Sequence, residues 1–223
     1  LRSHPVVTID GPSGSGKTTV SIRLAKAAGM VRVDTGAMYR AVALAARSKG
    51  VPWGDPVRIG GVAREVDLSF RPVAGTPRVF LSGEDVSEAI RTPEISMGAS
   101  AVSAHAPVRE ALVAKQREMA REGGVVLEGR DTGTVVFPDA EAKFFLDAAA
   151  PVRARRRQLQ LAPPETQPFE EVLRDVLRRD VQDSTREHSP LRVADGAVYI
   201  DSTTMTVDEV VGEMLRRLPG VPR

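Results

Sequence analysis

The sequence predicts an α/β protein with a five-stranded parallel sheet flanked by helices. Short, nearly continuous apolar runs alternate with helical stretches along most of the 223 residues. Such runs are typical of parallel strands that are buried on both faces. A glycine-rich turn directly after the first run predicts a ligand-binding loop, and residues 65–92 break the alternation with a short two-residue periodicity.

The elements of the main sheet follow one another in a regular order. The runs that predict buried strands are Val6–Asp10, Val31–Asp34, Val125–Glu128, Lys143–Leu146 and Ala197–Ile200. The stretches that predict helices are Thr18–Ala28, Ala37–Lys49, Pro107–Arg121, Pro151–Leu161, Phe169–Asp183 and Thr206–Leu218. Pro107 and Pro151 stand where a first helical turn accepts proline, which supports two of these starts.

The stretch between Glu65 and Thr92 predicts a small antiparallel meander inserted into the core. Its candidate strands are Val66–Phe70, Arg78–Leu81 and Asp85–Ser87, with turns at Pro72–Pro77 and Ser82-Gly83. We therefore expect this segment to stand apart from the main sheet.

The composition excludes several classes of protein. Hydrophobic residues at 42% and charged residues at 27% are ordinary for a soluble globular protein, and no apolar run approaches the ~20 residues that span a bilayer. The polar start Leu1–His4 is too short for a secretory leader, so we expect a cytoplasmic protein. The absence of cysteine excludes disulfides and thiolate metal sites, and three histidines argue against a zinc centre. The net charge of +2 gives no support for a nucleic-acid or membrane partner.

The segment Gly11–Thr18 fits the pattern G-x-x-x-x-G-K-T between a strand and a helix, which predicts a P-loop and the P-loop NTPase fold. Its glycines let consecutive N–H groups point at one anion, Lys17 supplies a charge between the outer phosphates, and the Thr18 hydroxyl is the candidate ligand of Mg²⁺. The residues that we expect to bind ATP are Gly11, Pro12, Ser13, Gly14, Ser15, Gly16, Lys17, Thr18 and Thr19. Motors, GTPases, transporters and small-molecule kinases share this loop, so it does not choose a reaction.

Arginines follow the second and third predicted strands and gather on one later helix. Arg40 and Arg130 come after strands whose carboxyl ends should meet at the ligand-binding edge of the sheet. Arg179, Asp183 and Arg186 are spaced by four and three residues, so they share one helical face. Each set alone is compatible with surface ion pairs of little consequence. Together they favour a second anion beside the first, namely an acceptor phosphate.

The run Arg153-Ala-Arg155-Arg156-Arg157 precedes the proline-rich segment Ala162–Pro168. This order favours a helical lid whose closure brings guanidinium groups to the transferring phosphoryl group and excludes water. A solvated basic helix and a nucleic-acid patch are the alternatives. The run is short and has no interleaved aromatic residues, which weighs against nucleic acid.

The motifs, in their order along nearly the whole chain, resemble those of bacterial cytidylate kinases. The segments that carry the resemblance are Gly11–Thr19, Asp34–Arg40, Gly83–Ser87 with Ile90-Arg91, Gly129–Asp131 with Gly133–Asp139, and Arg179-Asp180 through Ser189–Leu191. The resemblance implies the nucleoside monophosphate kinase type of fold and transfer of the γ-phosphoryl group of ATP to CMP or dCMP. It also implies a monomeric enzyme of pyrimidine nucleotide metabolism.

The resemblance further implies a role for each matching residue. The residues expected to grip the acceptor phosphate are Thr35, Arg40, Arg130 and Arg186. Those expected to read cytosine are Ser100, Arg109 and Asp131, and those expected to hold the sugar are Arg179 and Asp183. The residues expected to act in catalysis are Lys17, Arg130, Arg156 and Arg186, with Arg155 and Arg157 as alternatives to Arg156 in the lid. The corresponding division is a core over 1–64, a monophosphate-binding insert over 65–92, core over 93–150, the lid over 151–168 and core over 169–223.

The expected acceptor explains why no catalytic base is evident. A monophosphate has its second pKa at about 6, so it is mostly dianionic at neutral pH and needs no base. His4, His105 and His188 lie outside the core motifs. The rival interpretations are another P-loop kinase with adenylate or shikimate as acceptor, a GTPase-like switch, and a nucleic-acid-binding module. The switch usually needs a guanine-reading N-K-x-D segment, which is absent from this sequence.

Overall fold

A computed structural model describes residues 2–160 and 167–219 of the chain. The chain divides into two compact units, one made of Ser3–Met30 with Gly123–Arg223 and the other of Val31–Glu122. Of the predicted loop Ala162–Pro168, only Gln167 and Pro168 belong to the described residues.

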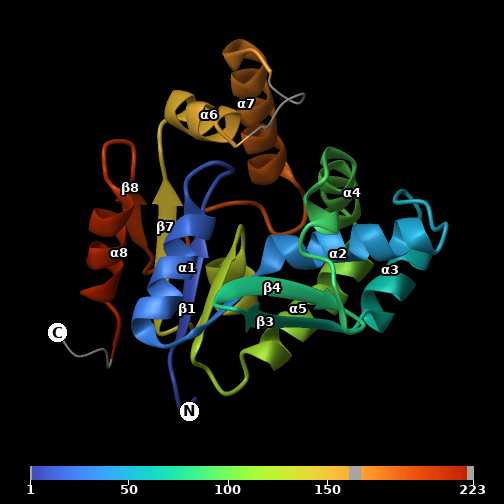
Figure 1. The fold of residues 1–223 in the computed structure, drawn as a ribbon, viewed down its shortest axis with the longest axis horizontal. Coiled ribbons are helices and arrows are strands. Elements are labelled where there is room, and N and C mark those ends of the chain that lie inside the picture. The colour runs from blue at the N-terminus through green and yellow to red at the C-terminus, as the bar shows by residue number, and fades with distance from the viewer. Residues whose placement is uncertain (1, 161–166, 220–223) are drawn as a thin grey trace. The chain divides into compact units, whose positions relative to one another are not determined.

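The predicted parallel sheet is confirmed. Its strand order is β2-β6-β1-β7-β8, and the strands are β1 (Val6–Asp10), β2 (Val31–Asp34), β6 (Val125–Gly129), β7 (Ala142–Asp147) and β8 (Val198–Asp201). Figure 1 labels β1, β7 and β8 of this sheet. Strand β1 pairs in parallel with both β6 and β7, and β7 pairs in parallel with β8. All residues of β1 and β6 are buried, which explains why most of them are apolar.

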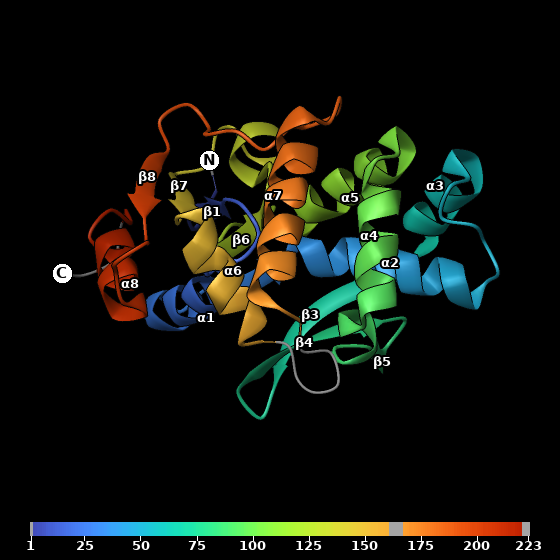
Figure 2. The same ribbon diagram turned by 90° about the horizontal axis from the view of Figure 1, so that it is seen from above.

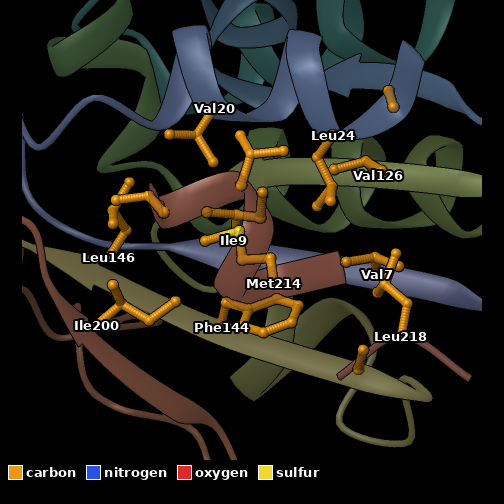
Figure 3. Close-up of a cluster of buried hydrophobic side chains, with 14 residues drawn as sticks. Val7, Ile9, Val20, Leu24, Val126, Phe144, Leu146, Ile200, Met214 and Leu218 are labelled. Atoms are coloured by element: carbon orange, nitrogen blue, oxygen red, sulfur yellow. The ribbon is translucent and has the colours of Figure 1, made fainter. Parts of the chain in front are cut away.

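Helices α1 (Lys17–Ala28) and α8 (Val207–Leu215) complete the core of the first unit. Figure 3 shows Val20 and Leu24 of α1 and Met214 of α8 packed with Ile9 and Phe144 of the sheet. These side chains are almost fully buried. At the start of α8, Thr206 forms the reciprocal capping box that the sequence pattern favours.

Helices α6 (Ala150–Gln158) and α7 (Phe169–Thr185) lie side by side in the first unit (Figures 1 and 2). Ala154 of α6 packs against Val172 and Val176 of α7. A five-residue π-helical turn, Thr132–Val136, follows β6 and was not predicted from the sequence. π-helical turns are rare in proteins, and those that do occur are frequently found at functional sites.

The second unit is built mainly from helices. These are α2 (Thr35–Ser48), α3 (Pro56–Glu65), α4 (Pro93–Ser103) and α5 (Ala106–Met119), together with the short 3₁₀ turn Ala89–Arg91. Helix α2 packs against α4, and α3 packs against α5. The prediction from sequence omitted α3 and α4. Both begin with a capping side chain directly before a proline, Asp55 before Pro56 and Thr92 before Pro93.

The antiparallel meander is confirmed as β3 (Leu68–Val73), β4 (Thr76–Leu81) and β5 (Glu84–Asp85). The turn predicted over Pro72–Pro77 is confirmed but is narrower than expected, because both prolines lie inside strands and face each other across the hairpin. The turn is Ala74-Gly75, with φ angles of 49° and 77°. Positive φ angles at both central residues match the twist of the strands in a tight hairpin. This requirement outweighs the preference of proline for turns. The turn predicted at Ser82-Gly83 is confirmed and has the same character, with φ angles of 50° and 84°.

Candidate active site

The P-loop connects the carboxyl end of β1 to α1, as predicted. Gly11 has a φ of 152°, and a Cβ there would lie 2.0 Å from the carbonyl oxygen of Leu146. At Gly14 a Cβ would lie 2.9 Å from the carbonyl oxygen of Arg153. Side chains at these two positions are therefore excluded, and the loop is held close to β7 and α6 with the N-terminus of α1 behind it. This is an arrangement that binds anions.

Lys17 is folded over the P-loop. Its side-chain Nζ donates to the carbonyl oxygen of Pro12 at 2.6 Å and lies 3.4 Å from the hydroxyl of Ser15. The residue is only 8% exposed. Burial and then the charge of Arg130 lower the pKa of Lys17 to about 7, although Glu128 and nearby aspartates act in the opposite direction. An anion in the loop would stabilise the charged ammonium that burial disfavours.

Glu128, at the end of β6, meets the first turn of α1. Its Oε1 accepts a hydrogen bond from the Thr18 hydroxyl at 3.0 Å, and its Oε2 accepts one from Ser21 at 2.5 Å. From the sequence, Glu128 was predicted only as the last residue of the buried strand Val125–Glu128. A carboxylate at a strand end directly before Gly129-Arg130 was the signal that could have identified it. Hydroxyl and carboxylate oxygens are suitable ligands for Mg²⁺.

A second missed residue, Asp10, holds the turn after β6. Its Oδ1 accepts from the backbone N–H and the hydroxyl of Thr132 at 2.9 and 2.7 Å, and its Oδ2 accepts from the N–H of Gly133 at 2.7 Å. Burial raises the pKa of Asp10, and the bonds from Gly133 and Thr132 offset part of this effect. Asp10 thereby fixes the residues that directly follow Arg130 and Asp131.

Two contacts between arginine and aspartate join this turn to the end of α7. Arg130 Nε donates to Asp183 Oδ2 at 2.7 Å. Arg186 Nη2 lies 3.9 Å from Asp131 Oδ1, while Arg186 Nε donates to the carbonyl oxygen of Ser189 at 2.6 Å. The structure thus brings together four of the predicted acceptor-binding residues. Glu128, two residues before Arg130, accepts a hydrogen bond from Thr18, so this group lies close to the P-loop.

The remaining predicted residues of the first unit lie on α6 and α7. Arg156 donates to the carbonyl oxygens of Ser15 at 3.2 Å and Ser202 at 2.8 Å, so it lies beside the P-loop. Arg155 turns elsewhere, with its guanidinium 4.8 Å from the centre of the Phe169 ring. Arg179 is half-buried on α7, one turn before Asp183.

In the second unit, Thr35 and Arg40 belong to the first turns of α2. Asp34 Oδ1 caps this helix through the N–H of Ala37 at 2.8 Å, and its Oδ2 lies 3.2 Å from Arg40 Nη2. Burial raises the pKa of Asp34, but Arg40 and Arg32 outweigh it and hold that pKa below its usual value. Within the described residues, the buried Nε of Arg40 has no hydrogen-bond acceptor.

Ser100 and Arg109 lie on neighbouring helices, α4 and α5. Ser100 is half-buried. Arg109 is only 4% exposed, donates to the carbonyl oxygen of Ser103 at 3.3 Å and lies 5.6 Å from the centre of the Tyr39 ring. Arg109 is therefore held in place within the second unit.

The described residues lack a membrane-spanning helix and a cluster of metal-binding side chains. Over residues 2–160 and 167–219, no helix has the length and apolar character needed to cross a membrane. The same ranges contain no group of three His, Cys, Asp or Glu side chains that could hold a metal ion on its own.

A P-loop at the carboxyl end of a parallel sheet places the protein among the P-loop NTPases, and the arginines beside the loop favour the kinases of this class. The chain belongs to the cytidylate kinase family, whose profile matches residues 7–219. It is 51% identical over 213 residues to the cytidylate kinase of Geobacter sp. (strain M21), covering 95% of this chain and 91% of that one. It is also 51% identical over 214 residues to the cytidylate kinase of Geobacter sulfurreducens, covering 96% and 92%. The family predicted from the motifs is thus confirmed, and ATP is the phosphoryl donor.

A solved structure, shikimate kinase from Acinetobacter baumannii in complex with shikimate, matches with a TM-score of 0.47 and 17% identity. The match covers 96% of this chain and 93% of that one.

Proposed function

We propose that the enzyme transfers the γ-phosphoryl group of ATP to CMP or dCMP, producing ADP with CDP or dCDP. The observation that carries this proposal is the match to the cytidylate kinase family over residues 7–219, which includes the P-loop and the arginines of α7. The rival acceptors adenylate and shikimate have no comparable support.

On the donor side, the loop Gly11–Thr19 would cradle the phosphates of ATP, with Lys17 between the outer two. Arg156 would add a second positive charge from α6. Thr18 and Glu128 present oxygen atoms 3.0 Å apart, which fits Mg²⁺ held by one or two protein groups together with substrate phosphates. When bound, the ion would neutralise charge on the phosphates.

On the acceptor side, the proposed phosphate ligands are Thr35, Arg40, Arg130 and Arg186. The buried Nε of Arg40 and the fixed guanidinium of Arg130 support this role. Ser100, Arg109 and Asp131 would read cytosine. Arg179 and Asp183 would hold the sugar.

The chemistry needs positioning more than proton transfer. The acceptor phosphate is already a nucleophile at neutral pH, so the enzyme's task is to hold two anions that repel each other and to neutralise the developing charge. Lys17, Arg130 and Arg186 would provide this charge in a buried setting, where electrostatic interactions are strong.

The enzyme is expected to prefer CMP to UMP by about 100-fold in kcat/KM. Asp131 would accept a hydrogen bond from the N4 amino group of cytosine, whereas uracil presents an O4 acceptor that the carboxylate repels. Incubation with Mg-ATP and CMP, dCMP, UMP or AMP, followed by identification of the diphosphate, measures this preference. Equal kcat/KM values for CMP and UMP would contradict the role of Asp131, and turnover of AMP alone would contradict the proposed function.

Binding of ATP at pH 8 is expected to take up about one proton. The pKa of Lys17 is about 7 in the free protein, so its amine is mostly neutral at pH 8, and the phosphates would raise that pKa and restore the charge. Calorimetry in two buffers of different ionisation enthalpy measures the uptake. The same titration at pH 6 is the control, because Lys17 is already charged there. Equal proton uptake at the two pH values would contradict this account.

We also infer a division of labour among the segments. The insert over 65–92 would help enclose the monophosphate, and the lid over 151–168 would close over the donor; residues 161–166 of this lid lie outside the described part of the chain. A monomer acting in the cytoplasm, without a nucleic-acid or membrane partner, fits a net charge of +2 and substrates that are small metabolites.

A further inference from the structure

Arg153 of α6 has no assigned role in the proposed reaction, although it is one of the most buried arginines of the site. Its side chain is 7% exposed. Its Nε donates to the carbonyl oxygen of Ala148 after β7 at 2.7 Å, and its Nη1 donates to that of Ser13 in the P-loop at 3.2 Å. Both Nη atoms also donate to the carboxylate of Asp180 on α7, at 3.0 and 2.6 Å. One guanidinium therefore connects the P-loop, the end of β7 and α7.

Through its contact with Ser13, Arg153 helps to shape the P-loop. The close approach at Gly14 shows that α6 lies directly on this loop. Arg153 binds the carbonyl oxygen of Ser13, and Arg156, one turn later, binds that of Ser15. In a trans peptide the C=O and the following N–H point in opposite directions. The two arginines thus hold the N–H groups of Gly14 and Gly16 turned away from α6.

Through its contact with Asp180, Arg153 fixes the part of α7 that is proposed to bind the acceptor. Asp180 lies next to Arg179 and three residues before Asp183, whose carboxylate binds Arg130. A bidentate contact between a planar guanidinium and a carboxylate restricts both sliding and rotation of the helix. A movement of α7 relative to the P-loop would break this contact.

We propose that Arg153 is a positioning residue that ties the donor loop to the acceptor-binding end of α7, an inference that rests on the proposed function. A buried ion pair is by itself weak evidence for a stabilising role, because the loss of hydration offsets the attraction between the charges. The network has a more specific consequence. Loss of the contact between Arg153 and Asp180 on α7 should weaken binding of the acceptor alone. Loss of the Arg153 guanidinium should weaken binding of both substrates.

The test compares Asp180→Asn with Arg153→Lys in steady-state kinetics. Asp180→Asn leaves the bonds from Arg153 to Ser13 and Ala148, so the KM for CMP is expected to rise about tenfold and the KM for ATP to stay within about twofold. Arg153→Lys loses the planar group that reaches both Ser13 and Asp180, so both KM values are expected to rise about tenfold. Asp175→Asn is the matched control on α7, because Asp175 forms an exposed pair with Arg178 at 2.9 Å. Its KM values are expected to equal those of the wild type.

Where a single variant fails to fold, the double variant Arg153→Met/Asp180→Leu replaces the pair with apolar groups, an exchange that buried pairs often tolerate. It is expected to unfold at a temperature near that of the wild type and to show both KM values raised. Wild-type protein that makes no CDP would overturn the proposed function and this inference with it. If the wild type does phosphorylate CMP, two results would overturn this inference alone. One is an equal change of both KM values in Asp180→Asn, and the other is wild-type KM values in the double variant.

Discussion

Replacement of Lys17 by alanine is expected to lower transfer from ATP to CMP by about 10³-fold, because this ammonium would neutralise the outer phosphates as charge develops on them. The Lys17→Ala variant should fold normally. Burial lowers the pKa of Lys17, which means that the folded protein disfavours the charged side chain. Removing it is therefore not expected to lower the melting temperature of the ligand-free protein.

The measurement combines kcat with a thermal unfolding curve for each variant. Lys26→Ala is a suitable control, because Lys26 lies on the same helix but is exposed. It should retain wild-type turnover. Activity of Lys17→Ala within tenfold of the wild type would remove Lys17 from the proposed mechanism, and a large fall in melting temperature would show that its role is structural.

The sequence predicted the strands and the P-loop because both depend on local patterns. A strand buried on both faces is mostly apolar, and β1, which is buried throughout, has Val6, Val7 and Ile9 among its five residues. The P-loop conformation requires glycine at Gly11 and Gly14, whose missing side chains leave room for Leu146 and Arg153. In each case the residues themselves carry the structural requirement.

The features that were missed depend on contacts between distant parts of the chain or on weak local signals. Helix α3 contains Gly60-Gly61, which lowers its intrinsic helix propensity, so its capping signal at Asp55-Pro56 carried little weight. The pairing of Arg130 with Asp183 joins residues 53 positions apart, and only the folded chain shows it. Asp10 and Glu128 resembled ordinary ends of buried strands, and their roles became evident from the hydrogen bonds they accept.

Replacement of Arg130 by alanine is expected to lower kcat/KM for CMP by about 100-fold or more, with the KM for ATP within about threefold of the wild type. Arg130 would supply part of the charge that binds the acceptor phosphate. Its removal also leaves the Asp183 carboxylate, now 2.7 Å from Arg130 Nε, without that partner. The free carboxylate would repel the incoming phosphate, so the loss should exceed that of a simple missing contact.

This second effect makes a double variant informative. In Arg130→Ala/Asp183→Asn the repelling charge is gone, so CMP should bind no more weakly than in Arg130→Ala, although a proposed sugar ligand has also been altered. Arg178→Ala is the control, since this arginine is exposed and pairs only with Asp175 among the contacts described for α7. A rise of the KM for ATP in step with that for CMP would instead assign Arg130 to the donor. If the double variant binds CMP much more weakly than Arg130→Ala does, the binding of the sugar by Asp183 outweighs the repulsion between its unpaired charge and the phosphate.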